Sequence, residues 1–290
     1  MLDITDLDWS FRERCCITLS TLSQMNEINS PQEDLDNFYV VAREAGAEHS
    51  GIPTWASRSD NPAGLDIDPD SGRIIRVQVE GVPGAYQLLN VLSQEECQRF
   101  VSITETLGYL EDAAVSLPRS VRHNHSTTWV TDEKTDGVIW SRIANFANQH
   151  VTNIHGADGH RGNPISDWFG GKQAVGLNAR FRFYRYEKGD FFRPHTDGSW
   201  PGSRVINGKL VACAYPDRWS QMTVLLFLTE DFEGGETQFM VDSENGMTGG
   251  ASNVESPLPV HVRTPMGGAL CVEVQTKSDT VLNQSERSEG

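Results

Sequence analysis

The sequence predicts an α+β protein in which β-strands predominate. Two segments with the 3.6-residue periodicity of amphipathic helices, Gln94–Leu107 and Lys134–Gln149, lie in the first half of the chain. Short segments with strand character then follow one another as far as Val274, separated by long polar loops and glycine-containing turns. Helices that precede a run of short strands predict an architecture in which the helices pack against a β-sandwich.

The first of these helices carries its own start and stop signals. Ser93 is typical of a helix N-cap, and Glu96, three residues later, completes a capping box. Gly108 is placed to end the helix directly after Leu107. Between these signals, buried positions are predicted at helical spacing at Cys97, Phe100, Val101, Thr104 and Leu107.

Strands are predicted where polar and apolar residues alternate, or where an apolar run is bounded by turn residues. They cover Arg73–Val79, Ala85–Val91, Met222–Thr229, Thr237–Val241, Val260–Arg263 and Ala269–Val274. Pro201–Trp219 is interpreted as a long polar connection. We interpret residues 1–71, which are polar and acidic, as an N-terminal extension of uncertain order with short helices at Arg12–Met25 and Gln32–Arg43. Residues 72–290 are predicted to form the folded domain.

Composition excludes several classes of partner. The chain has 290 residues and a formal net charge of −16, without a basic stripe, which argues against nucleic acid as a partner. It contains no apolar run long enough to span a membrane and no signal-peptide pattern at its start. The five cysteines form no even disulfide framework. These observations predict an intracellular protein, cytoplasmic or nuclear.

The stretch Gly176–Asp197 holds the most informative chemistry. Residues Arg180–Tyr186 alternate between polar and apolar side chains, which predicts a strand, and Glu187–Asp190 has good turn composition. The chain then continues to His195 and Asp197, which would point the same way on a strand. An imidazole and a carboxylate so placed are two of the three ligands of the 2-His-1-carboxylate triad, which holds Fe(II).

Four segments in order carry a resemblance to a known family. They are YQLLNVLSQEECQRFV, FYRYEKGDFFRPHTD, MTVLLFLTEDFEGGETQF and TPMGGALCVEV. From about Gln78 to Gly290, roughly three-quarters of the chain, the sequence resembles the prolyl 4-hydroxylase branch of the 2-oxoglutarate- and Fe(II)-dependent dioxygenases. The resemblance implies a double-stranded β-helix, or jelly roll, with iron at one mouth and supporting N-terminal helices.

The resemblance also implies roles for individual residues. His195 and Asp197 would bind iron and carry the catalysis. Tyr186 matches a tyrosine that lines the 2-oxoglutarate pocket, and Thr223 and Phe227 lie on the strand that walls that pocket. The implied cofactor is Fe(II) with 2-oxoglutarate as co-substrate, and ascorbate is a further candidate ligand. Gly234 and Gly235 match the turn motif and are expected to adopt positive φ.

Two features depart from the family pattern. Asn283 stands where the third iron ligand, a histidine, is expected, and the chain ends at Gly290, where a Gly-x-Lys segment and a final strand are expected. An amide oxygen is a much poorer Fe(II) ligand than an imidazole, so Asn283→His is predicted to raise iron affinity. Three explanations stay open: a truncated active enzyme, a divergent homologue without turnover, or a co-substrate cation elsewhere, with Arg180 and Arg182 as the nearest candidates.

The sequence therefore supports two hypotheses of different classes. In the first, the protein hydroxylates an unactivated C–H bond, which the resemblance suggests is in a peptidyl proline, so that its partner is a peptide or protein substrate. In the second, it is a catalytically silent jelly-roll homologue that binds a peptide or partner through the former substrate groove. The sequence does not indicate the oligomeric state.

Overall fold

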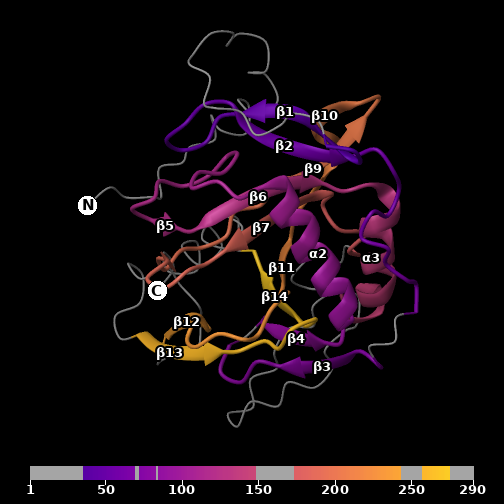
Figure 1. Cartoon of the computed structure of the whole chain (residues 1–290). Helices are drawn as coiled ribbons and strands as arrows, with labels where there is room; N and C mark the ends of the chain where they lie inside the picture. The colour runs from indigo at the N-terminus through magenta and orange to yellow at the C-terminus, as the bar shows by residue number, and fades with distance from the viewer. Residues whose placement is uncertain (1–34, 69–71, 83, 148–172, 243–256, 275–290) are drawn as a thin grey trace, which may run out of the picture.

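The computed structural model describes residues 35–68, 72–82, 84–147, 173–242 and 257–274. Strands are the commonest regular structure among these residues, and two four-stranded sheets dominate the architecture (Figure 1). The first sheet has the order β1-β2-β6-β7. Its strands are β1 (Phe38–Glu44), β2 (Ile52–Ser57), β6 (His125–Val130) and β7 (Arg180–Arg185). The pair β2 and β6 is parallel, whereas β1 with β2 and β6 with β7 are antiparallel.

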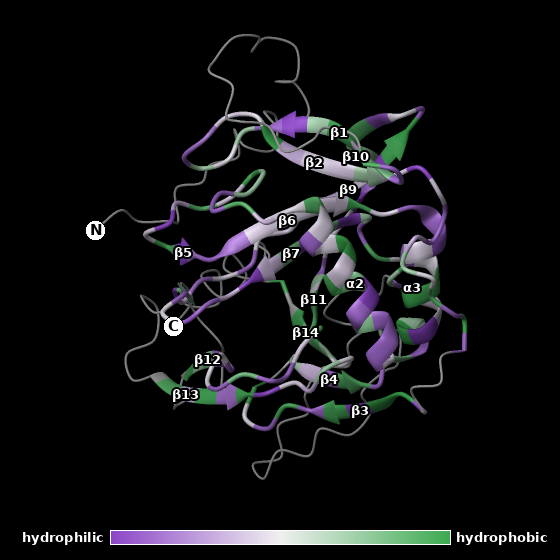
Figure 2. Ribbon diagram, viewed as in Figure 1, coloured by the Kyte–Doolittle hydropathy of each residue, from purple (hydrophilic) through white to green (hydrophobic). Residues whose placement is uncertain are grey.

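The second sheet has the order β11-β14-β4-β3, and all of its pairs are antiparallel. Its strands are β3 (Ile75–Gln78), β4 (Tyr86–Leu89), β11 (Met222–Leu226) and β14 (Ala269–Glu273). Figure 2 shows hydrophobic residues along β11 and β14, inside the molecule, and hydrophilic residues at β5, at its periphery. The predicted strands of this sheet are confirmed, apart from shifts of one to three residues at their ends.

Three smaller pairs make up the rest of the β-structure within the described ranges. β12 (Thr237–Asp242) pairs with β13 (Pro257–Val262), and β5 (Arg122–His123) pairs with β8 (Phe191–Phe192). β9 (Pro201–Ile206) pairs with β10 (Lys209–Trp219). The predicted polar connection over residues 201–219 is therefore wrong, because these residues form a hairpin. Its turn is Asn207-Gly208, and both residues have positive φ, as a tight hairpin turn requires.

The described residues contain the helices α2 (Gln94–Leu107) and α3 (Glu133–Ala147), and the sequence predicted both. The predicted capping box is present: Ser93 Oγ accepts a hydrogen bond from the Glu96 backbone N–H at 3.2 Å, and Glu96 Oε2 accepts one from the Ser93 N–H at 2.9 Å. The same carboxylate forms an ion pair with Arg142 of α3 at 2.7 Å, with both side chains at most 2% exposed. This buried pair joins the two helices.

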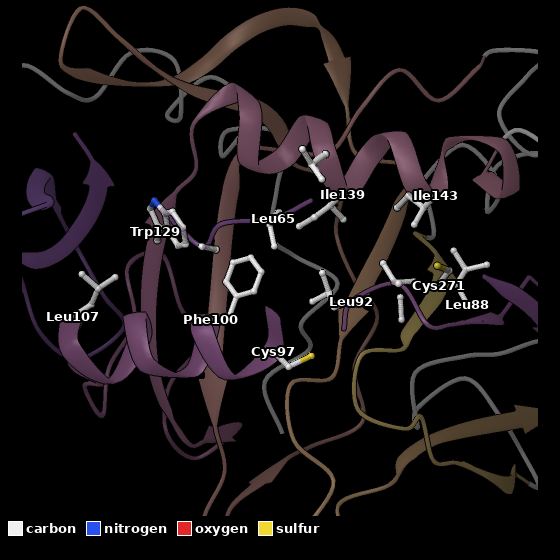
Figure 3. Packing of buried hydrophobic residues seen from close by; sticks show 14 of the residues in the cluster. Leu65, Leu88, Leu92, Cys97, Phe100, Leu107, Trp129, Ile139, Ile143 and Cys271 are labelled. Atoms are coloured by element: carbon white, nitrogen blue, oxygen red, sulfur yellow. The ribbon is translucent and has the colours of Figure 1, made fainter. Parts of the chain in front are cut away.

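One large hydrophobic cluster lies between the sheets and the helices (Figure 3). Trp55 and Trp129 contribute from the first sheet, Leu88 and Cys271 from the second, and Phe100 from α2. The Phe100 and Trp129 rings lie 6.0 Å apart, in the tilted geometry that aromatic pairs favour. The helices therefore pack on the sheets through shared apolar side chains, as the sequence pattern predicted.

Residues 35–68 belong to this same core, although the sequence analysis placed them in an extension of uncertain order. Trp55 is 1% exposed and Ala63 is fully buried. The predicted helix at Gln32–Arg43 is wrong where the structure describes it, because β1 begins at Phe38. The predicted helix at Arg12–Met25 lies outside the described residues. Of the helices that the structure describes, none has the length and apolarity to cross a membrane.

Candidate functional site

The site is built around the turn between β7 and β8. Asp190 closes this turn: its Oδ2 accepts a hydrogen bond from the Glu187 backbone N–H at 2.9 Å, and its own N–H donates to the Glu187 carbonyl at 3.0 Å. Gly189 supplies the positive φ, 93°, that the turn requires. Asp190 Oδ1 also lies 2.7 Å from His123 Nδ1 on β5. These contacts fix where the chain leaves β8 towards His195.

The His195 imidazole is held in one orientation and one tautomer. Its Nδ1 lies 2.8 Å from the Arg193 carbonyl oxygen, which can only accept a hydrogen bond, so Nδ1 carries the proton. In the neutral ring, Nε2 is then the unprotonated nitrogen. The ring stacks on Phe192 with the centroids 3.5 Å apart. Nε2 is therefore the nitrogen left for other contacts: in the protonated ring it can donate to a carboxylate, and in the neutral ring its lone pair can bind a metal, as in metal-binding histidines whose other nitrogen is hydrogen-bonded.

Asp197 faces that nitrogen. Its Oδ1 lies 3.3 Å from His195 Nε2, and its Oδ2 accepts a hydrogen bond of 2.6 Å from Thr223 Oγ1 on β11. Partial burial raises the pKa of Asp197, but the hydrogen bonds from His195 and Thr223, together with the charges of His195 and Arg122, lower it below its ordinary value. The carboxylate is therefore charged at neutral pH.

The structure brings the two predicted iron ligands together, although not on a strand. β8 ends at Phe192, and residues 193–200 have no regular secondary structure. The side chains of His195 and Asp197 are 30% and 40% exposed, so that small molecules can reach them. Within the described ranges, no group of three or more His, Cys, Asp or Glu side chains converges on one point. Asn283, the predicted third ligand, lies outside the described residues.

The donor set of this pair fits Fe(II). An imidazole nitrogen and a carboxylate oxygen converge, and each has its remaining polar atom held by a neighbouring group: Nδ1 by the Arg193 carbonyl and Oδ2 by the Thr223 hydroxyl. Such outer hydrogen bonds orient metal ligands and tune their basicity. Two protein ligands leave several coordination positions for exogenous ligands.

Of the other predicted site residues, Thr223 contacts this pair, whereas Phe227 and Tyr186 have other surroundings. Thr223 contacts Asp197 directly, whereas Phe227, one residue beyond β11, packs on a second apolar cluster with Val262 and Leu270. Tyr186 is 48% exposed. Burial of part of its ring raises the pKa of Tyr186, against an opposing effect of the Arg122 charge. Its hydroxyl therefore stays protonated at neutral pH and can donate a hydrogen bond.

The two arginines considered for the co-substrate differ in their partners. Arg180 Nη2 lies 2.6 and 2.8 Å from the two carboxylate oxygens of Glu44 on β1, and both side chains are largely buried. Arg182 donates to the Val115 carbonyl at 3.3 Å, and its guanidinium lies 4.7 Å from the centre of the Trp200 ring. Arg180 is therefore engaged within the first sheet, and Arg182 has no ion pair with a described carboxylate.

Arg122 on β5 is a functional candidate that the sequence analysis missed. Its guanidinium lies 4.1 Å from the centre of the Phe192 ring and 4.4 Å from that of Tyr184. Phe192 is the ring on which His195 stacks. No sequence pattern pointed to Arg122, because β5 is only two residues long and lies in a polar loop without hydrophobic periodicity. Its pairing with β8, in which Arg122 lies opposite Phe192, 70 positions later, brings Arg122 to the site.

Comparison of the chain with protein-family models, with curated proteins and with solved structures finds no match in any of the three.

Proposed function

We propose that the chain is an Fe(II)- and 2-oxoglutarate-dependent dioxygenase of the prolyl 4-hydroxylase type. One observation carries the proposal: His195 Nε2 and Asp197 Oδ1 converge at 3.3 Å, with the second polar atom of each side chain held by a hydrogen bond. A surface ion pair needs no such support. Two converging donors, each oriented by an outer contact, are what a metal site needs.

The arrangement of the sheets supports the same proposal. Thr223 of the second sheet reaches across to Asp197, in the segment that follows β8. The site therefore adjoins the second sheet through Thr223 of β11 and the first sheet through β7, which leads into the turn before β8. We propose that these sheets are the two walls of a double-stranded β-helix with the iron site at its mouth. The mainly β content and the two helices are in keeping with this fold.

In this proposal, His195 and Asp197 would hold Fe(II), and Asn283 is the candidate for a third position. The bound iron, with 2-oxoglutarate and oxygen, supplies the oxidising power for hydroxylation of an unactivated C–H bond. Thr223 fixes the orientation of the Asp197 carboxylate, and the Arg193 carbonyl fixes the tautomer of His195. Tyr186 keeps its proton and can donate a hydrogen bond to a carboxylate of the co-substrate.

A peptide or protein substrate fits the surroundings of the pair. Tyr186 and Phe191 present rings that are 48% and 38% exposed, and such rings suit the apolar face of a prolyl residue. The net charge of −16 favours a basic or neutral substrate over nucleic acid. We place the protein inside the cell, where the buried thiols of Cys97 and Cys271 stay reduced.

The test is formation of succinate from 2-oxoglutarate by the full chain, with Fe(II), ascorbate and proline-containing peptides. The proposal predicts succinate that depends on iron and is lost in His195→Ala and in Asp197→Ala. A matched control is His261→Ala on β13, which removes an imidazole outside the site and should leave succinate formation unchanged. If wild type forms no succinate but still binds peptides, the silent binding module is the better description. Loss of activity in all three variants alike would contradict the assigned site.

A further inference from the structure

Arg122 is a cation beside the candidate site that forms no ion pair with a described carboxylate. Arg142, Arg180 and Arg204, whose side chains are at most 14% exposed, each form an ion pair, with Glu96, Glu44 and Asp136 respectively. The half-buried Arg76, Arg119 and Arg182 form none with a described carboxylate, but none of them contacts the ring on which His195 stacks. Arg122 forms none with any described residue, although the chain has 40 acidic residues against 24 basic ones. In a protein with such an acidic excess, a positively charged side chain left without an ion pair at a candidate site is available for a ligand.

The Arg122 guanidinium is held in place by neutral groups. It lies over the rings of Tyr184 and Phe192, at 4.4 and 4.1 Å, and its Nη1 donates a hydrogen bond of 3.0 Å to the Tyr184 hydroxyl. Its Nε is buried and has no hydrogen-bond partner among the described residues, as is also true of one nitrogen in each of Arg142, Arg180, Arg182, Arg185 and Arg204. Buried donors are rarely left unpaired, and a charged guanidinium offers five N–H groups in a planar fork that matches a carboxylate.

This guanidinium is adjacent to the His195–Asp197 pair. Phe192 contacts both Arg122 and His195, and the charge of Arg122 helps to lower the pKa of Asp197. It also acts on the Tyr186 hydroxyl. A ligand that reaches His195 and Asp197 therefore lies within the field of Arg122.

We propose that Arg122 forms a carboxylate-binding subsite next to His195 and Asp197, with the Tyr184 hydroxyl as its neighbour. Two sources can supply the carboxylate: the far end of a 2-oxo dicarboxylate, or an acidic side chain of a peptide substrate. The first source rests on the function proposed above, whereas the second needs only that a peptide binds there. Both share the planar, two-oxygen anion that a guanidinium fork binds.

The experiment measures binding by calorimetry, with Mn(II) in place of Fe(II) so that no turnover occurs. The ligands are 2-oxoglutarate and 2-oxopentanoate, which share the keto-acid end but differ in the distal carboxylate, and a glutamate-containing peptide with its glutamine counterpart. The variants are Arg122→Met, which keeps the apolar body of the side chain, and Arg218→Met as the matched control. The Arg218 guanidinium also lies over a tyrosine ring, 4.6 Å from the centre of Tyr215, but on β10, which carries none of the site residues. Thermal unfolding confirms that each variant is folded.

The expected result is that wild type and Arg218→Met bind 2-oxoglutarate about 10- to 100-fold more tightly than 2-oxopentanoate, and that Arg122→Met loses this preference. If only the preference for the glutamate peptide is lost, Arg122 serves the substrate instead, and the subsite stands. If Arg122→Met does not fold, Arg122→Lys takes its place and should weaken carboxylate binding about tenfold, because lysine lacks the planar fork.

Unchanged preferences in the folded Arg122 variant, or an equal loss of preference in Arg218→Met, would overturn the assignment. The proposed function fails in a different way. It requires that binding of 2-oxoglutarate depends on Mn(II) and is lost in His195→Ala. If that dependence is absent while carboxylate binding still requires Arg122, the subsite is correct and the iron-dependent function is not.

Discussion

Replacing Thr223 by Val tests whether the Asp197 carboxylate is held ready for a metal ion. The two side chains have nearly the same shape, and the change removes the hydrogen bond of 2.6 Å from Thr223 Oγ1 to Asp197 Oδ2. A hydrogen bond to a charged group contributes about 1.5–3 kcal/mol, which corresponds to a factor of about 10 to 100 in affinity. Because Asp197 is 40% exposed, water replaces part of this contact. We therefore expect Thr223→Val to weaken metal binding by a factor near the lower limit of that range, about tenfold.

The assay is an anaerobic titration of the apo-protein with Fe(II), or with Co(II) as a spectroscopic substitute. Thr106→Val is the matched control, because Thr106 lies exposed on α2 and its hydroxyl donates a hydrogen bond of 2.8 Å to the Ser102 carbonyl. It should leave metal affinity unchanged. Equal affinities of Thr223→Val and wild type, in folded protein, would refute the reasoning that this hydroxyl orients a metal ligand.

Three further predictions concern the scaffold. Arg142→Met should destabilise the fold by about 3–5 kcal/mol in chemical denaturation, because it leaves the buried Glu96 carboxylate without its counter-charge; a loss below about 1 kcal/mol would contradict this. Burial raises the pKa of Asp112, but hydrogen bonds from four backbone N–H groups lower it below the ordinary value. The stabilisation from the Asp112 carboxylate is therefore present above its unfolded-state pKa of about 4 and is lost as the pH falls through the lower folded-state value. Asp112→Asn should make the free energy of unfolding depend less on pH in the acid range. An unchanged dependence would count against this. Gly267→Ala should cost about 2 kcal/mol or more, because φ is 76° and the new Cβ would meet the Leu92 carbonyl oxygen at 2.3 Å; unaltered thermal unfolding would argue against that contact.

Local signals in the sequence were enough for the helices and for much of the second sheet. The capping box of Ser93 and Glu96 depends on residues three apart, and the structure contains it. Gly234 and Gly235 adopt the predicted positive φ. His195 and Asp197 were expected to point the same way because they lie two apart on a strand. Their side chains do lie 3.3 Å apart, but the segment is not a strand, so the reason given for the prediction does not hold.

Contacts between distant segments could not be predicted in this way. β2 joins the first sheet by parallel pairing with β6, more than 70 positions later, and Trp55 of β2 is buried in the core. Nothing within residues 52–57 indicates this partner. Arg122 is likewise brought to the site by β5 pairing with β8. The partner of Arg180 is Glu44, on a strand that the sequence analysis interpreted as part of a helix.

The central claim is that His195 and Asp197 form the protein part of an iron site that also takes 2-oxoglutarate. The most direct measurement is an anaerobic titration of the full chain with Fe(II) in the presence of 2-oxoglutarate, recorded by visible absorption. We predict the weak metal-to-ligand charge-transfer band of the ternary complex at one iron per chain, and its loss in His195→Ala and in Asp197→Ala. No band in the folded wild-type protein, or a band that persists in both variants, would contradict the claim.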